Sequence, residues 1–503
     1  MQITLELTTD TSSQQTMTSS SRKYARDFLS FVNASPTPFH VIESAKQRLL
    51  KAGFSEIRER DSWAEAVETG GRYFLTRNGS SLIAFGVGKK WKSGNGMALL
   101  GTHTDSPALR VKPVSKRFAE KDSFMQVGVE TYGGGLWHTW FDRDLSIAGR
   151  AMVRQSDGSI VSKLIKINNP ILRIPTLAIH LERQESFTFS KETQLFPIIG
   201  LAATALNKPS SPPAEEPGKK TEDGEFKPLV AITERHHPAV VGLIAKEAGV
   251  NVSDVLDFEM ILYDTQASCL GGINDEFIFS ARLDNLDMSY CAIEGIIESL
   301  ELKDALDDES GIRLISLFDH EEIGSQTAQG ADSNLLPAVI RRLSTLTDAG
   351  STSSPTAYEE TLVKSMLWSC DMAHSVHPNY PAKYESHHRP EMNKGPVIKI
   401  NANARYATNS PGIVLTEEVA REAGVPLQLF VVRNDSPCGS TIGPMLSAAL
   451  GIRTVDMGNA QLSMHSIRET GGAHDIEYAV KLFKKYFERF SKLEETIMVD
   501  STT

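Results

Sequence analysis

The stretch Leu317-Phe-Asp-His-Glu-Glu-Ile-Gly324 places four ionisable residues in a row after the mostly apolar run 312–318. That run has the β-branched and large side chains that are typical of a buried strand. A buried carboxylate is costly unless it meets a cation. Adjacent residues of an extended segment point to opposite sides, so one glutamate could bind a metal while the other stays free as a base. Taken alone, such a stretch is more often a solvated strand end with surface acids, so the rest of the chain must decide.

The chain has 503 residues, and because a single core rarely grows that large we expect two domains. A net charge of −11 argues against partnership with nucleic acid or an anionic membrane. The four cysteines show no CxxC spacing, which indicates a reducing, cytoplasmic compartment and no cysteine zinc site. No apolar run approaches the ~20 residues that span a bilayer.

The pattern of apolar runs changes twice along the chain. Apolar runs of strand and helix type alternate before residue 109 and again after 277, which predicts an α/β domain with a mostly parallel sheet flanked by helices. Between them, short β-like runs separated by glycine turns predict an inserted β-rich domain, with a helix at 176–183 and a mobile polar loop at 208–228. We therefore divide the chain into a disordered extension 1–21, a catalytic domain 22–108 and 263–503, and an insert 109–262.

Potential metal ligands follow several apolar runs. His103 and Asp105 form a His-x-Asp pair, in which the acid could fix the imidazole tautomer, although such pairs are common by chance. Asp284 falls where a strand meets a helix, and an N-cap explains it as well as a ligand does. Asp371 follows another strand, and His465 lies near the C-terminus. With a glutamate of the opening stretch they form the ligand set of a two-metal hydrolytic site, in which nitrogen and oxygen donors favour zinc over Mn²⁺ or Co²⁺.

Seven motifs then follow one another along nearly the whole chain. They begin with Gly-Thr-His-Thr-Asp-Ser-Pro from Gly101, Trp-His-Thr-Trp-Phe-Asp-Arg-Asp-Leu from Trp137, Ala-Arg-Leu-Asp-Asn from Ala281 and Asp-His-Glu-Glu-Ile-Gly-Ser from Asp319. They end with Asp-Met-Ala-His-Ser-Val-His-Pro-Asn-Tyr from Asp371, Arg-Asn-Asp-Ser-Pro-Cys-Gly-Ser-Thr-Ile-Gly-Pro from Arg433 and Met-His-Ser-Ile-Arg-Glu from Met464. Together they resemble the aspartyl aminopeptidases, a family of co-catalytic zinc aminopeptidases with a zinc-peptidase-like fold.

The resemblance implies two zinc ions in each subunit, with Mn²⁺ or Co²⁺ as the alternative at one site. Asp284 would bridge the ions, His103 and Asp371 would complete one site, and Glu322 and His465 the other.

The resemblance also assigns the catalytic groups. Glu321 would be the general base that takes a proton from the attacking water and passes it to the leaving amine. Asp105 would support His103. His180 would reach the active site of a neighbouring subunit, although a lone histidine in an apolar stretch is more often a core or interface residue.

Members of the family prefer peptides with an N-terminal Asp or Glu. Such a side chain needs a cation, and Lys399 is the leading candidate, its alternative being a solvated strand lysine. His374 and Tyr406 would also line the pocket. The family assembles as a dodecamer built from dimers through the inserted domain, and its members occur in the cytoplasm or are delivered to the vacuole.

Two other functions have to be weighed against an aminopeptidase. A two-metal phosphoesterase would want basic clamps or a glycine-rich anion loop near the acids, and neither is evident in the sequence. A non-catalytic scaffold or cargo protein of the same fold would tolerate loss of the base or of a ligand, yet all six positions are filled.

Overall fold

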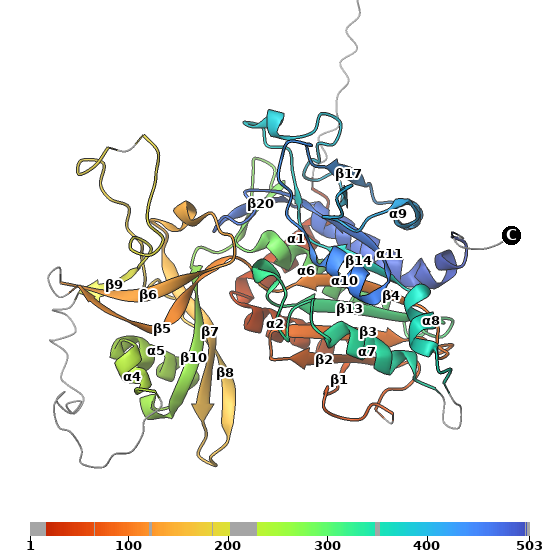
Figure 1. Ribbon diagram of the computed structural model, residues 1–503, viewed down its shortest axis with the longest axis horizontal. Coiled ribbons are helices and arrows are strands. Elements are labelled where there is room, and N and C mark those ends of the chain that lie inside the picture. Colours follow the sequence, from red (N-terminus) through yellow and green to blue (C-terminus); the bar gives the residue numbers. More distant parts are fainter. Residues whose placement is uncertain are drawn as a thin grey trace, which may run out of the picture.

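A computed structural model describes residues 17–64, 66–119, 123–183, 185–201, 229–347, 353–497 and 499. Its largest element is a nine-stranded sheet, seen at the right of Figure 1. In sheet order the strands are β1 (Ser55–Glu56), β2 (Arg72–Arg77), β3 (Ser81–Val87), β13 (Ile312–Phe318), β4 (Met97–His103), β14 (Met366–Cys370), β18 (Arg453–Gly458), β16 (Val397–Ile400) and β17 (Gln428–Val431).

Helices cover both faces of this sheet, which explains why its central strands are apolar throughout. In β13, for example, Leu314 packs into the core on one face and Ile315 into the core on the other. One core holds α1 (Ser19–Ala34), α2 (Pro38–Lys51), α6 (Leu283–Ser299), α9 (Ser410–Ala423) and α11 (Asp475–Glu494). The opposite core holds α7 (Leu335–Ser344), α8 (Ala357–Val363) and α10 (Ile442–Leu450). The predicted α/β fold is confirmed.

The central strands β13, β4, β14 and β18 run parallel. Phe318 at the end of β13 pairs with His103 at the end of β4. The register places Ser369 of β14 opposite Gly101 of β4, so all three strands end at the same edge. Residues that follow these strands therefore meet at the carboxyl edge of the sheet, where open α/β folds place their sites.

A second, six-stranded antiparallel sheet takes all its strands from residues 108–264 and lies beside the first, at the left of Figure 1. In sheet order it contains β8 (Ile160–Lys166), β7 (Leu145–Arg154), β10 (Val255–Asp264), β5 (Ala108–Ala119), β6 (Phe124–Tyr132) and β9 (Ile198–Leu201). Helices α4 (Ile232–Arg235) and α5 (Pro238–Ala248) accompany it, and α5 packs its apolar side into the core of this sheet.

A small third sheet is built from strands that follow the second sheet in the chain and from two later segments. Its strands, in order, are β11 (Cys269–Gly271), β12 (Phe277–Ser280), β20 (Glu469–Gly472), β19 (Ala460–Leu462) and β15 (Ala373–His374). No helix among the described residues is long and apolar enough to cross a membrane.

Two local expectations differ from the structure. The predicted helix at 176–183 is wrong: the segment is irregular, with a turn at 179–181, because its exposed apolar side chains have no core to pack against. Helix α1 begins at Ser19, inside the extension expected to be disordered, and the Thr18 side chain caps it by accepting the Ser21 N–H. Residues 1–16 and the expected loop 208–228 lie outside the described residues.

Trp368 of β14 supports the strand that leads to Asp371. Its ring is fully buried and stacks on Tyr486 of α11 with centroids 3.8 Å apart. We expect Trp368→Ala to lower the free energy of unfolding by about 3–5 kcal/mol, because the lost ring leaves a cavity. Urea unfolding at matched protein concentration measures this, with Leu302→Ala at an exposed turn as the near-neutral control. A loss below about 1 kcal/mol would contradict the packing described.

Candidate metal centre

The first group of ligand candidates lies around His103, at the end of β4. Its Nε2 atom is 3.3 Å from Asp284 Oδ1 and 3.6 Å from Asp371 Oδ1. Its Nδ1 atom lies 3.0 Å from the main-chain oxygen of Asp105 and 3.4 Å from the carboxylate of the same residue. The carbonyl is thus the nearer acceptor, which differs from the expected carboxylate contact. With Nδ1–H donated to that carbonyl, Nε2 keeps a lone pair for a metal.

The second group lies around His465, in the turn between β19 and β20. His465 Nε2 is 3.2 Å from Asp284 Oδ2 and 3.3 Å from Glu322 Oε2. Its Nδ1 atom lies 3.0 Å from the carbonyl oxygen of Gly134, so this imidazole is oriented in the same way. The described residues form three groups of potential ligands, each with its ligand atoms within 4.8 Å of one another. Two of them, His103–Asp284–Asp371 and Asp284–Glu322–His465, share Asp284, and the third is His103–Glu321–Glu322.

The sequence left two interpretations of Asp284 open, a helix N-cap and a metal ligand. The position that precedes α6 is Arg282, and the helix has no side-chain cap hydrogen bond. Asp284 instead directs its two carboxylate oxygens toward the two imidazoles. These imidazoles hold its pKa well below the usual range, against the effect of burial. Asp284 therefore lies between the two imidazoles and belongs to both of their ligand groups.

The two glutamates of the opening stretch lie on a short 3₁₀ turn, Glu321–Ile323, and not on an extended segment as expected. Their side chains nevertheless separate: Glu322 approaches His465, while Glu321 Oε2 lies 3.9 Å from His103 Nε2. Asp105 holds this turn, because its carboxylate accepts the main-chain N–H groups of both glutamates at 3.1 Å. Asp105 therefore acts on the glutamates and is not itself within either ligand group.

The second sheet also supports the centre. The Tyr132 hydroxyl, at the end of β6, donates to Asp105 Oδ2 at 2.7 Å. Gly134 accepts from His465, and the Leu136 N–H donates to the His465 carbonyl at 2.9 Å. The end of β6 and the segment that follows it therefore support Asp105, which holds the glutamate turn, and the ligand His465.

Burial and the charges of neighbouring groups both shift the pKa values of the cluster. It raises the pKa of Glu321 to about 8, with His103 acting against it and Asp371 acting with it. Burial, followed by the charge of Asp284, raises the pKa of Glu322 well above its ordinary value. For His465, burial lowers the pKa, but the carboxylate of Asp284 outweighs it and raises the pKa to about 9. The cluster therefore carries more carboxylates than its own cations can neutralise.

These residues fit zinc. Three buried oxygens, Asp284 Oδ1, Glu322 Oε1 and Asp371 Oδ1, make no hydrogen bond with the described residues. Orphaned buried oxygens are costly, and a cation satisfies them. Two imidazoles and three carboxylates without a thiolate are donors that Zn²⁺ takes.

Lys399 lies beside this cluster. It is only 3% exposed, so the alternative of a solvated strand lysine is wrong. Its Nζ atom donates to the Met372 carbonyl at 2.8 Å and lies 3.8 Å from Asp371 Oδ2. The ring of Tyr406 lies 5.4 Å from the same atom. His374 is exposed and meets Phe430 edge-on, on the strand next to Lys399.

His180 is not brought to these ligands within the chain. It lies in an exposed turn between β8 and β9, and no group of potential metal ligands among the described residues includes it.

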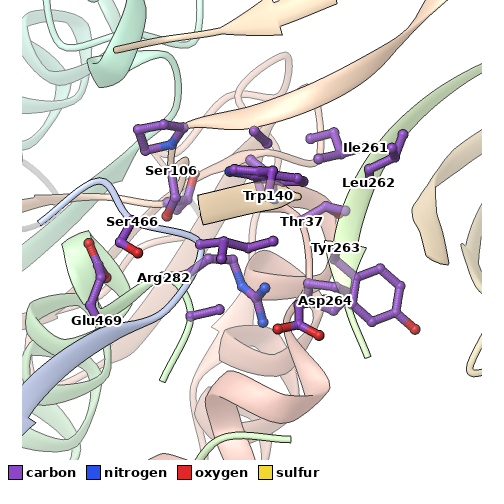
Figure 2. A pocket seen from close by; sticks show the side chains of 17 residues that line it. Thr37, Ser106, Trp140, Ile261, Leu262, Tyr263, Asp264, Arg282, Ser466 and Glu469 are labelled. Carbon is purple, nitrogen blue, oxygen red and sulfur yellow. The ribbon is translucent and has the colours of Figure 1, made fainter. Parts of the chain in front are cut away.

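The sequence did not single out Tyr132 or Glu469. Glu469 is 2% exposed and closes the motif that begins at Met464, and its place in that motif was the available signal. It also lines the pocket shown in Figure 2, whose strand residues come from the second sheet and from β20 of the third.

An α/β sheet with a shared-carboxylate cluster at its edge defines a metal-dependent hydrolase. Residues 31–487 match the model of the aminopeptidase I zinc metalloprotease family (M18), and the chain belongs to that family. It is therefore a zinc metalloaminopeptidase that acts on peptides, which decides against the phosphoesterase and the non-catalytic scaffold.

Relatives and solved structures agree with this family. The chain is 66% identical to the aspartyl aminopeptidase of Aspergillus oryzae, over 95% of this chain and 98% of the relative. It is 53% identical to aspartyl aminopeptidase 4 of Saccharomyces cerevisiae, over 96% of this chain and 99% of the relative. It superposes on the Ape4 chain of the cryo-EM Ape4–Nbr1 complex with a TM-score of 0.88 and 49% identity, covering 96% and 88% of the two chains. It superposes on a chain of the S. cerevisiae mApe1 dodecamer with a TM-score of 0.80 and 31% identity, covering 94% of this chain and 98% of the other.

Because Asp284 belongs to both ligand groups, we expect Asp284→Asn to lower zinc binding at both. Elemental analysis after dialysis against trace zinc should find less than one ion per subunit. Asp287→Asn is the matched control, since Asp287 lies three residues further along the chain and its carboxylate accepts a hydrogen bond from the Asn459 side chain. Full zinc content in Asp284→Asn would contradict a shared ligand.

Proposed function

We propose that this aminopeptidase removes N-terminal Asp and Glu residues from peptides, using two zinc ions in each subunit and Glu321 as the general base. The observation that carries the proposal is the buried ammonium of Lys399 beside two ligand groups that share Asp284. The relatives from A. oryzae and S. cerevisiae bear the name aspartyl aminopeptidase. Mn²⁺ or Co²⁺ is the alternative at one of the two sites.

When bound, the ions would lower the pKa of water toward ~7 and polarise the scissile carbonyl. Glu321 takes the proton of the attacking water on its carboxylate and delivers it to the leaving amine. Burial is the largest influence on this carboxyl and raises its pKa in the protein without metal. Asp105 keeps the base in place through the Glu321 N–H.

Lys399 supplies the charge that an acidic side chain needs. Its ammonium has three N–H donors, of which one is committed to the Met372 carbonyl, so donors remain for a carboxylate. Tyr406 and His374 flank the same strand end and would line the pocket.

The role of Glu321 as a base, and not as a ligand, is open to a direct test. We expect Glu321→Gln to lower kcat by about 10²–10⁴-fold, because proton transfer is lost. Zinc content should stay at the wild-type value. Hydrolysis of Asp- and Glu-aminoacyl reporters with parallel elemental analysis checks both; loss of zinc together with activity would make Glu321 a ligand.

The acidic specificity should depend on Lys399. We expect Lys399→Met to lower kcat/KM for Asp- and Glu-reporters by about 30-fold or more, the effect of removing one partner of a buried charge pair. A Leu-reporter should change much less. Lys394→Met, an exposed lysine just before the same strand, is the control. An equal loss on all reporters would count against a specificity role.

We further infer that the protein is a homo-oligomer, a dodecamer built from dimers through the inserted segment 109–262. Support comes from the mApe1 dodecamer and from the exposed turn around His180. Leu177, Ile179 and Leu181 there are 56%, 66% and 75% exposed, and clustered apolar exposure is typical of an interface. His180 would thereby complete the active site of a neighbouring subunit.

This arrangement predicts complementation between two inactive chains. Glu321→Gln and His180→Ala should each lose activity, but co-assembled subunits should regain part of it. The mixed pair contains one site with an intact Glu321 and a His180 donated by the neighbour. Separately purified and simply mixed preparations serve as the control. A co-assembled sample no more active than the mean of its parts would contradict donation in trans.

We also propose the division into a catalytic domain, 22–108 with 263–503, and a dimerisation domain, 109–262. The separate six-stranded sheet supports it. A cytoplasmic location is proposed, with vacuolar delivery as the alternative. All four cysteines are free in the structure, which fits a reducing compartment.

A further inference from the structure

A single buried carboxylate joins two of the ligand segments. Glu469, the first residue of β20, accepts the Asp284 N–H on Oε2 at 3.1 Å and the His465 N–H on Oε1 at 2.8 Å. Asp284 lies at the start of α6 and His465 in the turn after β19. Among the described residues Glu469 forms no salt bridge, so both of its oxygens serve the two ligand backbones.

The turn that presents His465 needs such support. Its backbone is left-handed, with φ of +67°, a conformation that non-glycine residues rarely adopt. The Glu469 carboxylate fixes the main-chain N–H, and the Leu136 N–H fixes the carbonyl. The ring is fixed by Gly134, so the Nε2 atom points toward Asp284 and Glu322.

Asp284 is held from two sides. Glu469 accepts its N–H, and the Ser106 hydroxyl donates to its carbonyl at 2.6 Å. In Figure 2, Ser106, Ser466 and Glu469 lie along one side of the pocket, opposite residues 261–263. The remaining ligands of the first group need no such link, because His103 ends β4 and Asp371 directly follows β14.

We propose that Glu469 is a positioning residue that fixes the spacing between Asp284 and His465 and so sets the zinc affinity of the Asp284–Glu322–His465 group. That group contains both ligands held by Glu469, whereas the His103–Asp284–Asp371 group contains only one. Loss of the link therefore weakens zinc binding at the Asp284–Glu322–His465 site more than at the His103–Asp284–Asp371 site. The inference rests on the proposed two-zinc centre.

Glu469→Gln tests this with little change of shape. The amide offers one acceptor oxygen, so one of the two backbone N–H groups would face an NH₂ donor. We expect affinity at the Asp284–Glu322–His465 site to fall about 10–100-fold, as for other residues that orient ligands, with a smaller change at the other site. Titration of the metal-free full-length protein with zinc against a chromophoric chelator measures both sites. His465→Ala and Asp371→Ala identify which step belongs to which site.

Asp475→Asn is the matched control. Asp475 is also a buried carboxylate that accepts two backbone N–H groups, from Asn393 at 2.6 Å and Gly395 at 2.9 Å, but neither belongs to a ligand. It should lower stability and leave both zinc affinities in place. Glu469→Asp keeps the charge but is one methylene too short to reach both N–H groups, and it should reproduce the preferential loss. Equal weakening of the two sites, no weakening, or the same pattern in Asp475→Asn would overturn the proposal.

A measurement on the wild type covers the case in which the variants do not fold. In the metal-free protein the amides of Asp284 and His465 should be protected from hydrogen exchange, although the His465 side chain is 31% exposed. Fast exchange at both would overturn the link. Binding of a single zinc by the wild type would contradict the two-zinc proposal, and the exchange result would still report on Glu469 separately.

Discussion

The structure depends on the concentration of carboxylates at one buried edge of a sheet. Asp284, Glu322 and Asp371 approach two imidazoles, and several of their oxygens have no hydrogen bond among the described residues. Burying such groups without a cation costs several kcal/mol for each charge, so folding of this edge and metal binding are coupled. The hydrogen bonds of Asp105 and Glu469 do not relieve the charge. They fix where it lies, and this is what a metal with defined geometry requires.

The register of parallel strands explains why the ligands meet. Because β4, β13 and β14 run in the same direction and are aligned within a residue or two, His103, the glutamate turn and Asp371 all leave the sheet at the same level. The strands are buried on both faces and therefore leave their polar chemistry to the residues that follow them.

The second sheet contacts the metal centre. Tyr132 contacts Asp105, which accepts the Glu322 N–H, and Gly134 orients His465, so a segment from outside the nine-stranded sheet supports the Asp284–Glu322–His465 group. The geometry of a metal centre built in this way depends on the relative position of the two sheets. In an oligomer whose subunits meet through the second sheet, assembly and the geometry of the centre would be coupled through these contacts.

The sequence by itself determined the α/β class, the principal strands and the residue types of the centre, because apolar periodicity and acids after strands are local patterns. It did not determine the irregular segment 176–183, where propensity had no packing to support it, or the 3₁₀ turn that carries Glu321. Only the tertiary structure decided that Asp284 is a ligand candidate and not a helix cap, that Lys399 is buried, and that Glu469 links Asp284 to His465. Those facts are contacts between segments far apart in the chain. Such contacts depend on the order of the strands in the sheet, which no local pattern of residues encodes.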